Sequence, residues 1–109
     1  LIVPMPPDNR FDPVYQMYTI RVLKGLETRN DLMSFLKEKG IITKVYFDPV
    51  HEYTVFKKFL DEEVYLPNTV ELSKQVISLP LYPSISKENL DYIVAKVKEF
   101  FKDGGEVYE

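Results

Sequence analysis

Residues 66–101, LPNTVELSKQVISLPLYPSISKENLDYIVAKVKEFF, decide the fold of this chain. Their second half has the periodicity of a long amphipathic helix, with Ser86 where an N-cap is expected and Gly104-Gly105 where the helix should end. The pattern predicts a helix that covers one face of a small sheet. Its apolar face is formed by Leu90, Ile93, Val94, Val97, Phe100 and Phe101.

The first half of this stretch predicts a shorter helix followed by an extended segment. Asn68 and Glu71 have the spacing of a capping box, so we expect a helix of roughly ten residues that ends at Pro80. Residues 77–85 (ISLPLYPSI), which contain two prolines, are expected to be extended. The apolar positions assigned to this helix are Val70, Leu72, Val76, Ile77 and Leu79.

Two strands are predicted upstream. Residues 14–22 (VYQMYTIRV) are rich in β-branched and aromatic residues, which favours a strand. Residues 41–47 (IITKVYF) predict a second strand, which Asp48-Pro49 ends. By alternation, the buried face of the first strand should hold Val14, Gln16, Tyr18, Ile20 and Val22.

The segments after these strands are predicted to be helical. Thr28 reads as an N-cap, which predicts a helix over residues 29–39 with Gly40 as its C′ residue. Residues 55–59 form one apolar side of a possible short helix, and the acidic residues 61–63 read as a solvated loop. The resulting order predicts an α+β domain with a small, mostly antiparallel sheet covered by helices on one face.

Composition limits what the 109 residues can do. A chain without cysteine has no disulfide framework, no thiolate zinc site and no cysteine nucleophile. The formal net charge of −3 argues against nucleic-acid binding. No apolar run is long enough to span a membrane, and the composition fits a cytoplasmic protein.

The first residues carry an unusual density of proline. Residues 1–13 (LIVPMPPDNRFDP) begin with Leu1 and contain Pro4, Pro6, Pro7 and Pro13. Because proline lacks an N–H and restricts the residue before it, this stretch is predicted to be an extended linker and not a regular helix or central strand. The alternative is the frayed terminus of a complete protein.

Two residues are candidates for ligand contact, although catalytic motifs are nearly absent. His51 follows a predicted strand and a proline turn, and histidine is the residue type that most often supplies a polar contact and a proton near neutral pH. Tyr46 lies on the second predicted strand, opposite in orientation to Phe47, and suits stacking or hydrogen bonding. The plainer interpretations are a partly exposed loop histidine and simple packing at a sheet edge.

Three segments together resemble the DegT/DnrJ/StrS sugar aminotransferases. Residues 15–21 (YQMYTIR) are similar to a Y-H-L-Y-x-I-R strand of that family, and residues 36–41 (LKEKGI) to its L-x-x-K-G-I helix end. Residues 77–83 (ISLPLYP) resemble its L-S-L-P-x-Y-P element. The resemblance runs from about residue 14 to residue 101, which is nearly the whole chain.

The resemblance implies a pyridoxal-phosphate enzyme of aspartate-aminotransferase type (fold type I). Such an enzyme moves an amino group onto a nucleotide-linked keto sugar, in polysaccharide biosynthesis, and works as a homodimer. Its large N-terminal domain holds the cofactor on a lysine. None of the lysines in this chain has that context, so we expect no catalytic, cofactor-binding or metal-binding residue here.

The resemblance also divides the chain. Residues 1–13 would be a linker from a missing N-terminal domain, residues 14–103 the C-terminal small domain, and residues 104–109 a tail. His51 matches a loop histidine near the sugar-nucleotide cleft, so the expected substrate contacts are Tyr46 and His51. The chain departs from the family at Gln16 and at Tyr46-Phe47, where histidines often stand.

An independent module competes with this interpretation. A ferredoxin-like ligand-binding or regulatory domain shares the β-α-β order, and fold order alone does not separate the two. The module predicts a self-contained polar surface. The aminotransferase domain, inactive alone, predicts an apolar face without a partner in the chain.

Overall fold

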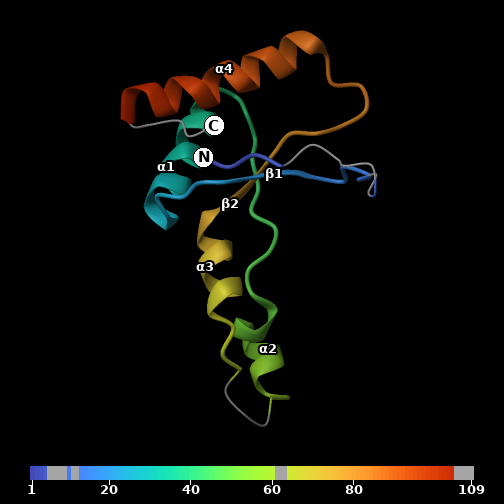
Figure 1. Ribbon diagram of the computed structural model, residues 1–109, viewed down its shortest axis with the longest axis vertical. Helices are drawn as coiled ribbons and strands as arrows, with labels where there is room; N and C mark the ends of the chain where they lie inside the picture. The colour runs from blue at the N-terminus through green and yellow to red at the C-terminus, as the bar shows by residue number, and fades with distance from the viewer. Residues whose placement is uncertain (5–9, 11–12, 61–63, 105–109) are drawn as a thin grey trace.

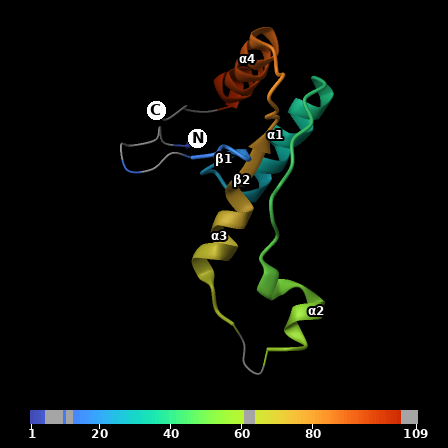
Figure 2. The same ribbon diagram turned by 90° about the vertical axis from the view of Figure 1, so that its right-hand side faces the viewer.

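The computed structural model describes residues 1–4, 10, 13–60 and 64–104, with side chains up to residue 102. A small sheet lies with two helices at one end of the molecule, and the remaining helices extend away from it (Figures 1 and 2). The elements are β1 (Tyr18–Arg21), α1 (Leu26–Glu38), the 3-10 turn η1 (Val50–Glu52), α2 (Thr54–Lys57), α3 (Pro67–Gln75), β2 (Val76–Leu79) and α4 (Lys87–Gly104).

The sheet is an antiparallel pair in which Ile20 lies opposite Ile77. One further residue pair is added at each edge. Ile2 exchanges two backbone hydrogen bonds with Arg21 on the outer side of β1. Lys44 exchanges two with Ser78 on the outer side of β2. The described residues therefore confirm a small antiparallel sheet, built from two strands and two isolated bridges.

The core lies where α1 and α4 meet the sheet. Leu32 and Leu36 of α1 are completely buried, as is Ile77 of β2. The rings of Phe35 and Phe100 lie 5.5 Å apart and join the two helices. The full set of buried apolar residues is Ile20, Val22, Leu32, Leu36, Ile41, Ile77, Ile93, Val97 and Phe101.

The long helix forms as predicted. The backbone N–H of Asn89 donates to Ser86 Oγ at 3.2 Å, so Ser86 is the N-cap. Gly40 follows α1 with φ +77°, a conformation that glycine adopts without steric cost. The predicted C-terminal tail lies outside the described residues except for Gly104, and the acidic loop 61–63 lies wholly outside them.

Of the two predicted upstream strands, the first is shorter than expected and the second does not form. The first begins at Tyr18, and Val14, assigned to its buried face, is 91% exposed. Residues 41–47 are not a strand, since Lys44 alone pairs with β2. Alternate residues of a strand direct their N–H and C=O groups to opposite edges. Because β2 has four residues and pairs with β1 along one edge, few of its N–H and C=O groups point to the other edge, where residues 41–47 could pair with them.

The helix predicted to end at Pro80 is too long, whereas the extended conformation predicted from residue 77 is confirmed as far as Leu79. The helix ends at Gln75, and the next four residues form β2. Val76 and Ile77 are β-branched, and in the strand conformation Ile77 becomes fully buried against β1. Tertiary pairing thus overrides the helical spacing of the apolar residues.

The predicted N-caps Thr28 and Asn68 are wrong. The residue at the N-cap position of α3 is Leu66, so Asn68 lies inside the helix. α1 begins at Leu26 after Gly25, so Thr28 lies inside it. Neither helix has a side-chain cap. Pro67 at the start of α3 needs no hydrogen-bond partner for its backbone nitrogen, which lowers the demand for a cap.

We call residues 50–60 and 64–66 the arm, and the part built from β1, β2, α1 and α4 the body. The arm contains η1 and α2, and α3 leads from it back to the sheet (Figures 1 and 2). The radius of gyration is 16.1 Å, against about 13 Å for a compact domain of about 100 residues. The arm therefore makes the molecule elongated.

Candidate functional site

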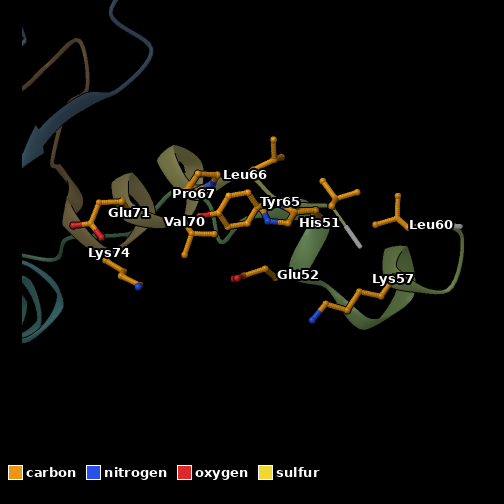
Figure 3. Close-up of a pocket in the computed structure, with 11 residues that line it drawn as sticks. His51, Glu52, Lys57, Leu60, Tyr65, Leu66, Pro67, Val70, Glu71 and Lys74 are labelled. Carbon is orange, nitrogen blue, oxygen red and sulfur yellow. The ribbon is translucent and has the colours of Figure 1, made fainter. Parts of the chain in front are cut away.

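The largest described hollow lies between the arm and α3. Its volume is about 720 Å³, and it is open to solvent. In Figure 3, Tyr65 and His51 are both drawn in the middle part of the lining. Glu71 and Lys74 of α3 stand at one end, and Lys57 of α2 stands at the other. The lining residues are His51, Glu52, Lys57, Leu60, Val64, Tyr65, Leu66, Pro67, Val70, Glu71 and Lys74.

A short 3-10 turn places His51 in this hollow. Pro49 fixes the start of η1, and its carbonyl accepts a hydrogen bond from the N–H of Glu52 at 2.9 Å. His51 is half-buried, whereas every other described residue of the arm is exposed. Among the described residues of the arm, His51 is therefore the one most covered by its neighbours.

The charges around the hollow are mixed. Lys57 and Lys74 supply positive charge, while Glu52 and Glu71 supply negative charge. The Glu71 carboxylate accepts a hydrogen bond from Gln75 Nε2 at 2.8 Å. Gln75 Oε1 in turn accepts two from Arg21 of β1, at 2.8 and 3.2 Å. A hydrogen-bonded chain thus runs from the sheet to the wall of the hollow and fixes Glu71.

Tyr46 lies elsewhere. It lines a separate hollow of about 190 Å³ beside the sheet, together with Gln16 and Lys44. Its ring meets that of Phe47 edge-on at 5.0 Å, and both residues are exposed. The structure therefore does not bring Tyr46 and His51 into one hollow. It does bring together Gln16 and Tyr46, two positions at which the sequence departs from the resembled family.

The chain carries a buried cation next to the sheet. The Arg29 side chain donates to the carbonyl of Val76 and to Asn30 Oδ1, at 3.1 and 2.9 Å. Burial lowers the pKa of Arg29, and the negative charge of Asp48 opposes that shift. Because Arg29 holds the junction of α1 with β2, its role is structural.

Lys96 does not have the properties of a lysine that holds pyridoxal phosphate. A lysine that forms a Schiff base needs a lowered pKa, which desolvation or a neighbouring cation provides. Lys96 shows the opposite, since its hydrogen bond to Glu99 raises its pKa. Among the described residues, no three histidine or acidic side chains are grouped so as to hold a metal ion.

Sequence reasoning missed part of the hollow. Lys57, Tyr65 and Lys74 were not singled out in the sequence analysis. Val70 and Lys74 are four residues apart, so they lie on the same side of α3. This spacing was the feature of the sequence from which their shared position in the hollow could have been predicted. That this side turns toward the arm depends on how the chain folds back, which no local pattern encodes.

No described helix combines the length and apolarity that crossing a membrane would require.

Comparison with known proteins identifies the family. The model of the DegT/DnrJ/EryC1/StrS aminotransferase family matches residues 1–98. The chain belongs to this family, which confirms the resemblance seen in the sequence. The family is one of pyridoxal-phosphate-dependent sugar aminotransferases, and the independent ligand-binding module is not favoured.

Several curated relatives are similar to nearly all of the chain. A pleiotropic regulatory protein of Geobacillus stearothermophilus is 37% identical over 94% of this chain and 26% of its own length. A GDP-perosamine synthase of Escherichia coli O157:H7 is 32% identical over 82% of this chain and 23% of its own. The chain therefore spans about a quarter of the length of these relatives.

Solved structures of the same kind share the fold. DesV of S. venezuelae, in complex with a ketimine intermediate, gives a TM-score of 0.77 at 27% identity, over 91% of this chain and 26% of that one. The aminotransferase TlmJ of Streptoalloteichus hindustanus gives 0.80 at 19% identity, over 93% and 26%. Because its sequence identity is only 19%, the similarity to TlmJ is evidence for the fold alone.

Proposed function

We propose that this chain is the C-terminal small domain of an enzyme that transfers an amino group to a nucleotide-linked keto sugar. The observation that carries the proposal is the family match over residues 1–98 in a chain a quarter as long as its relatives. A GDP-perosamine synthase and a dTDP-sugar transaminase of Streptomyces venezuelae are among those relatives. A spore coat polysaccharide biosynthesis protein of Bacillus subtilis suggests polysaccharide synthesis as the use of the product.

In this proposal the chain is inactive alone and supplies one wall of the substrate cleft. A large domain outside this chain would provide the cofactor lysine and the phosphate-binding groups. The parent would work as a cytoplasmic homodimer. A cysteine-free sequence is consistent with that location.

His51 is the proposed substrate contact in the hollow, and Tyr46 is a second one in its own hollow beside the sheet. An imidazole or a phenol can hydrogen-bond a sugar hydroxyl or a phosphate oxygen, so both suit a nucleotide sugar. Their separation means that they would touch different parts of one extended ligand. Docking of the large domain would close the walls that are open here.

The test uses the full-length parent with glutamate as donor and a panel of TDP-, GDP- and UDP-linked keto sugars. We expect His51→Ala to lower kcat/KM by about ten- to a hundredfold, mainly through KM, because a hydrogen bond to substrate is lost. The absorbance of bound cofactor should be unchanged. Tyr46→Phe should act in the same direction, and Tyr53→Phe, a tyrosine of similar exposure, is its control.

Two results would count against the proposal. A parent protein that binds no pyridoxal phosphate would refute the assigned reaction. A His51→Ala enzyme with unchanged KM for every sugar would remove His51 from the site.

A further inference from the structure

One charged side chain in the hollow between the arm and α3 is held in place by a neighbour. The charged residues that line this hollow are Glu52, Lys57, Glu71 and Lys74. Glu71 Oε1 accepts a hydrogen bond from Gln75 Nε2 at 2.8 Å. Among the described residues, the other three charged side chains have no hydrogen-bond or ion-pair partner. Glu71 is therefore the charged group whose position is set before a ligand binds.

Gln75 can hold Glu71 because it is itself fixed against the sheet. Gln75 is 6% exposed, and its Oε1 accepts two hydrogen bonds from Arg21 of β1. Its backbone carbonyl accepts another from the N–H of Val22 at 2.9 Å. Glu71 and Gln75 are four residues apart on α3, so both lie on the same side of the helix. The position of Glu71 is thus tied to the body of the molecule.

The chemistry of Arg21 decides how the Gln75 amide is oriented. A guanidinium group has only N–H donors, so it requires the amide oxygen of Gln75 and leaves the amide NH₂ group to point toward Glu71. Oε1 of Glu71 supplies the acceptor that this NH₂ group needs. Oε2 of Glu71 has no hydrogen-bond partner in the part of the chain that the structure describes. Figure 3 shows Glu71 at one end of the hollow, where Oε2 can accept a hydrogen bond from a ligand.

We propose that Glu71 is a specificity-determining residue that accepts a hydrogen bond from a hydroxyl of the nucleotide sugar, with Arg21 and Gln75 as its positioning residues. This inference rests on the proposed function. A carboxylate accepts hydrogen bonds from hydroxyls and is repelled by phosphate, so it selects the sugar or the ribose and not the diphosphate. A side chain that is already held loses less conformational freedom on binding, which favours Glu71 over Glu52 for this contact.

The first test compares Glu71→Gln with the unchanged full-length parent, with glutamate as the amino donor. The new amide keeps an oxygen for Gln75 Nε2 but turns its NH₂ group toward the hollow, and it lacks the charge that strengthens a hydrogen bond. We expect KM for the keto-sugar nucleotide to rise about tenfold, while kcat changes less than about twofold and KM for glutamate stays the same. The matched control is Glu38→Gln, the same change at an exposed position of α1 outside the hollow.

A second pair of variants tests the positioning by Gln75. Gln75→Glu keeps an acceptor for Arg21 but places a second carboxylate against that of Glu71, so KM for the keto sugar should again rise about tenfold. Adding Glu71→Gln should lower that KM at least about threefold, because the amide at position 71 then donates to the carboxylate at position 75 and presents its oxygen to the hollow. If Gln75 only stabilises the fold, the second change brings no recovery. Circular dichroism and the absorbance of bound cofactor check that each variant folds.

The hydroxyl itself is identified with keto-sugar nucleotides that each lack one hydroxyl, on the sugar or on the ribose. The ratio of KM in Glu71→Gln to KM in the parent should fall from about ten to about one for one of these substrates. That substrate shows whether the sugar or the ribose supplies the hydroxyl. A ratio that stays the same for every substrate overturns the proposal, because the contact would not be to a hydroxyl.

Failure of this proposal is distinct from failure of the proposed function. An unchanged keto-sugar KM in Glu71→Gln, in a parent that binds pyridoxal phosphate and aminates the sugar, overturns the role of Glu71 and leaves the proposed function intact. An equal rise in Glu38→Gln, or a matching rise in KM for glutamate, assigns the effect to a general disturbance of the enzyme and also overturns that role. A parent that binds no cofactor and aminates no keto sugar refutes the proposed function and the role of Glu71 together.

Discussion

The body and the arm both contain large apolar side chains, but these side chains form a buried cluster in the body and are exposed in the arm. In the body, apolar side chains from α1, α4 and both strands meet in one buried cluster. In the arm, apolar side chains of comparable size remain exposed. Hydrophobicity in a sequence therefore does not show which surface of a protein will cover a residue.

The largest effect that separates the two regions is expected from side-chain truncation. Leu36→Ala removes a completely buried side chain of the body and should lower the free energy of unfolding by about 2–5 kcal/mol. Phe59→Ala, in the arm, should change it by no more than about 0.5 kcal/mol, because the ring is already 78% exposed. Urea unfolding of this chain followed by circular dichroism measures both. A large loss from Phe59→Ala would mean that the arm is already packed within the chain.

A smaller effect is expected where the two regions join. Arg21 of β1 donates two hydrogen bonds to Gln75 at the end of α3, and Gln75 is 6% exposed. Arg21→Met should cost about 1–3 kcal/mol, because the buried amide oxygen of Gln75 loses its donor. The double variant Arg21→Met/Gln75→Met should cost less than the sum of the single changes. Additivity within about 0.5 kcal/mol would show that the contact does not couple sheet and helix.

The smallest effect concerns a surface ion pair of the body. Lys96 Nζ donates to Glu99 Oε2 at 2.6 Å on α4, which lowers the pKa of Glu99 and raises that of Lys96. The lowered Glu99 pKa means that its stabilisation is present above its ordinary value of 4.5 and is lost as pH falls through the folded value. The raised Lys96 pKa means that its stabilisation is present below 10.5 and is lost as pH rises through the folded value.

Glu99→Gln should therefore lower Tm slightly at about pH 7 and have no effect at about pH 2, where both forms are neutral at this position. Thermal unfolding at the two pH values measures the difference. Salt at about 1 M should reduce the effect at neutral pH, since it screens exposed charges. An effect of equal size at both pH values would assign it to helix propensity and not to charge.

The sequence predicted the body better than the arm, and helices better than strands. α4 was predicted from its periodicity and from Ser86, because its apolar face and cap are local features. β2 was predicted in part, since residues 77–85 were expected to be extended and β2 is Val76–Leu79. Its start was not, because Val76 and Ile77 also fit a helical spacing, and only pairing with a strand 55 or more positions away decides between the two conformations. Thr28 and Asn68 had the right spacing for caps but lie inside helices that begin earlier.

The candidate site was predictable only as separate residues. His51 was singled out by its chemistry and by the proline turn before it, and the structure places it in the largest described hollow. Tyr65 and Lys74 join it there because α3 folds back beside the arm, a long-range arrangement without a local signal. The roles of His51 and Tyr46 in substrate contact stay predictions until the parent enzyme is tested.

The bridge between Ile2 and Arg21 has a consequence for chain entropy. Its two hydrogen bonds, at 2.9 and 2.8 Å, close the intervening segment into a loop. Closing a flexible loop costs entropy that grows with its length. Here four prolines fall within the loop, and each limits the conformations open to the unfolded chain. The sheet thus gains an additional backbone pair at its edge for a smaller entropic loss than a glycine- or serine-rich segment of equal length would impose.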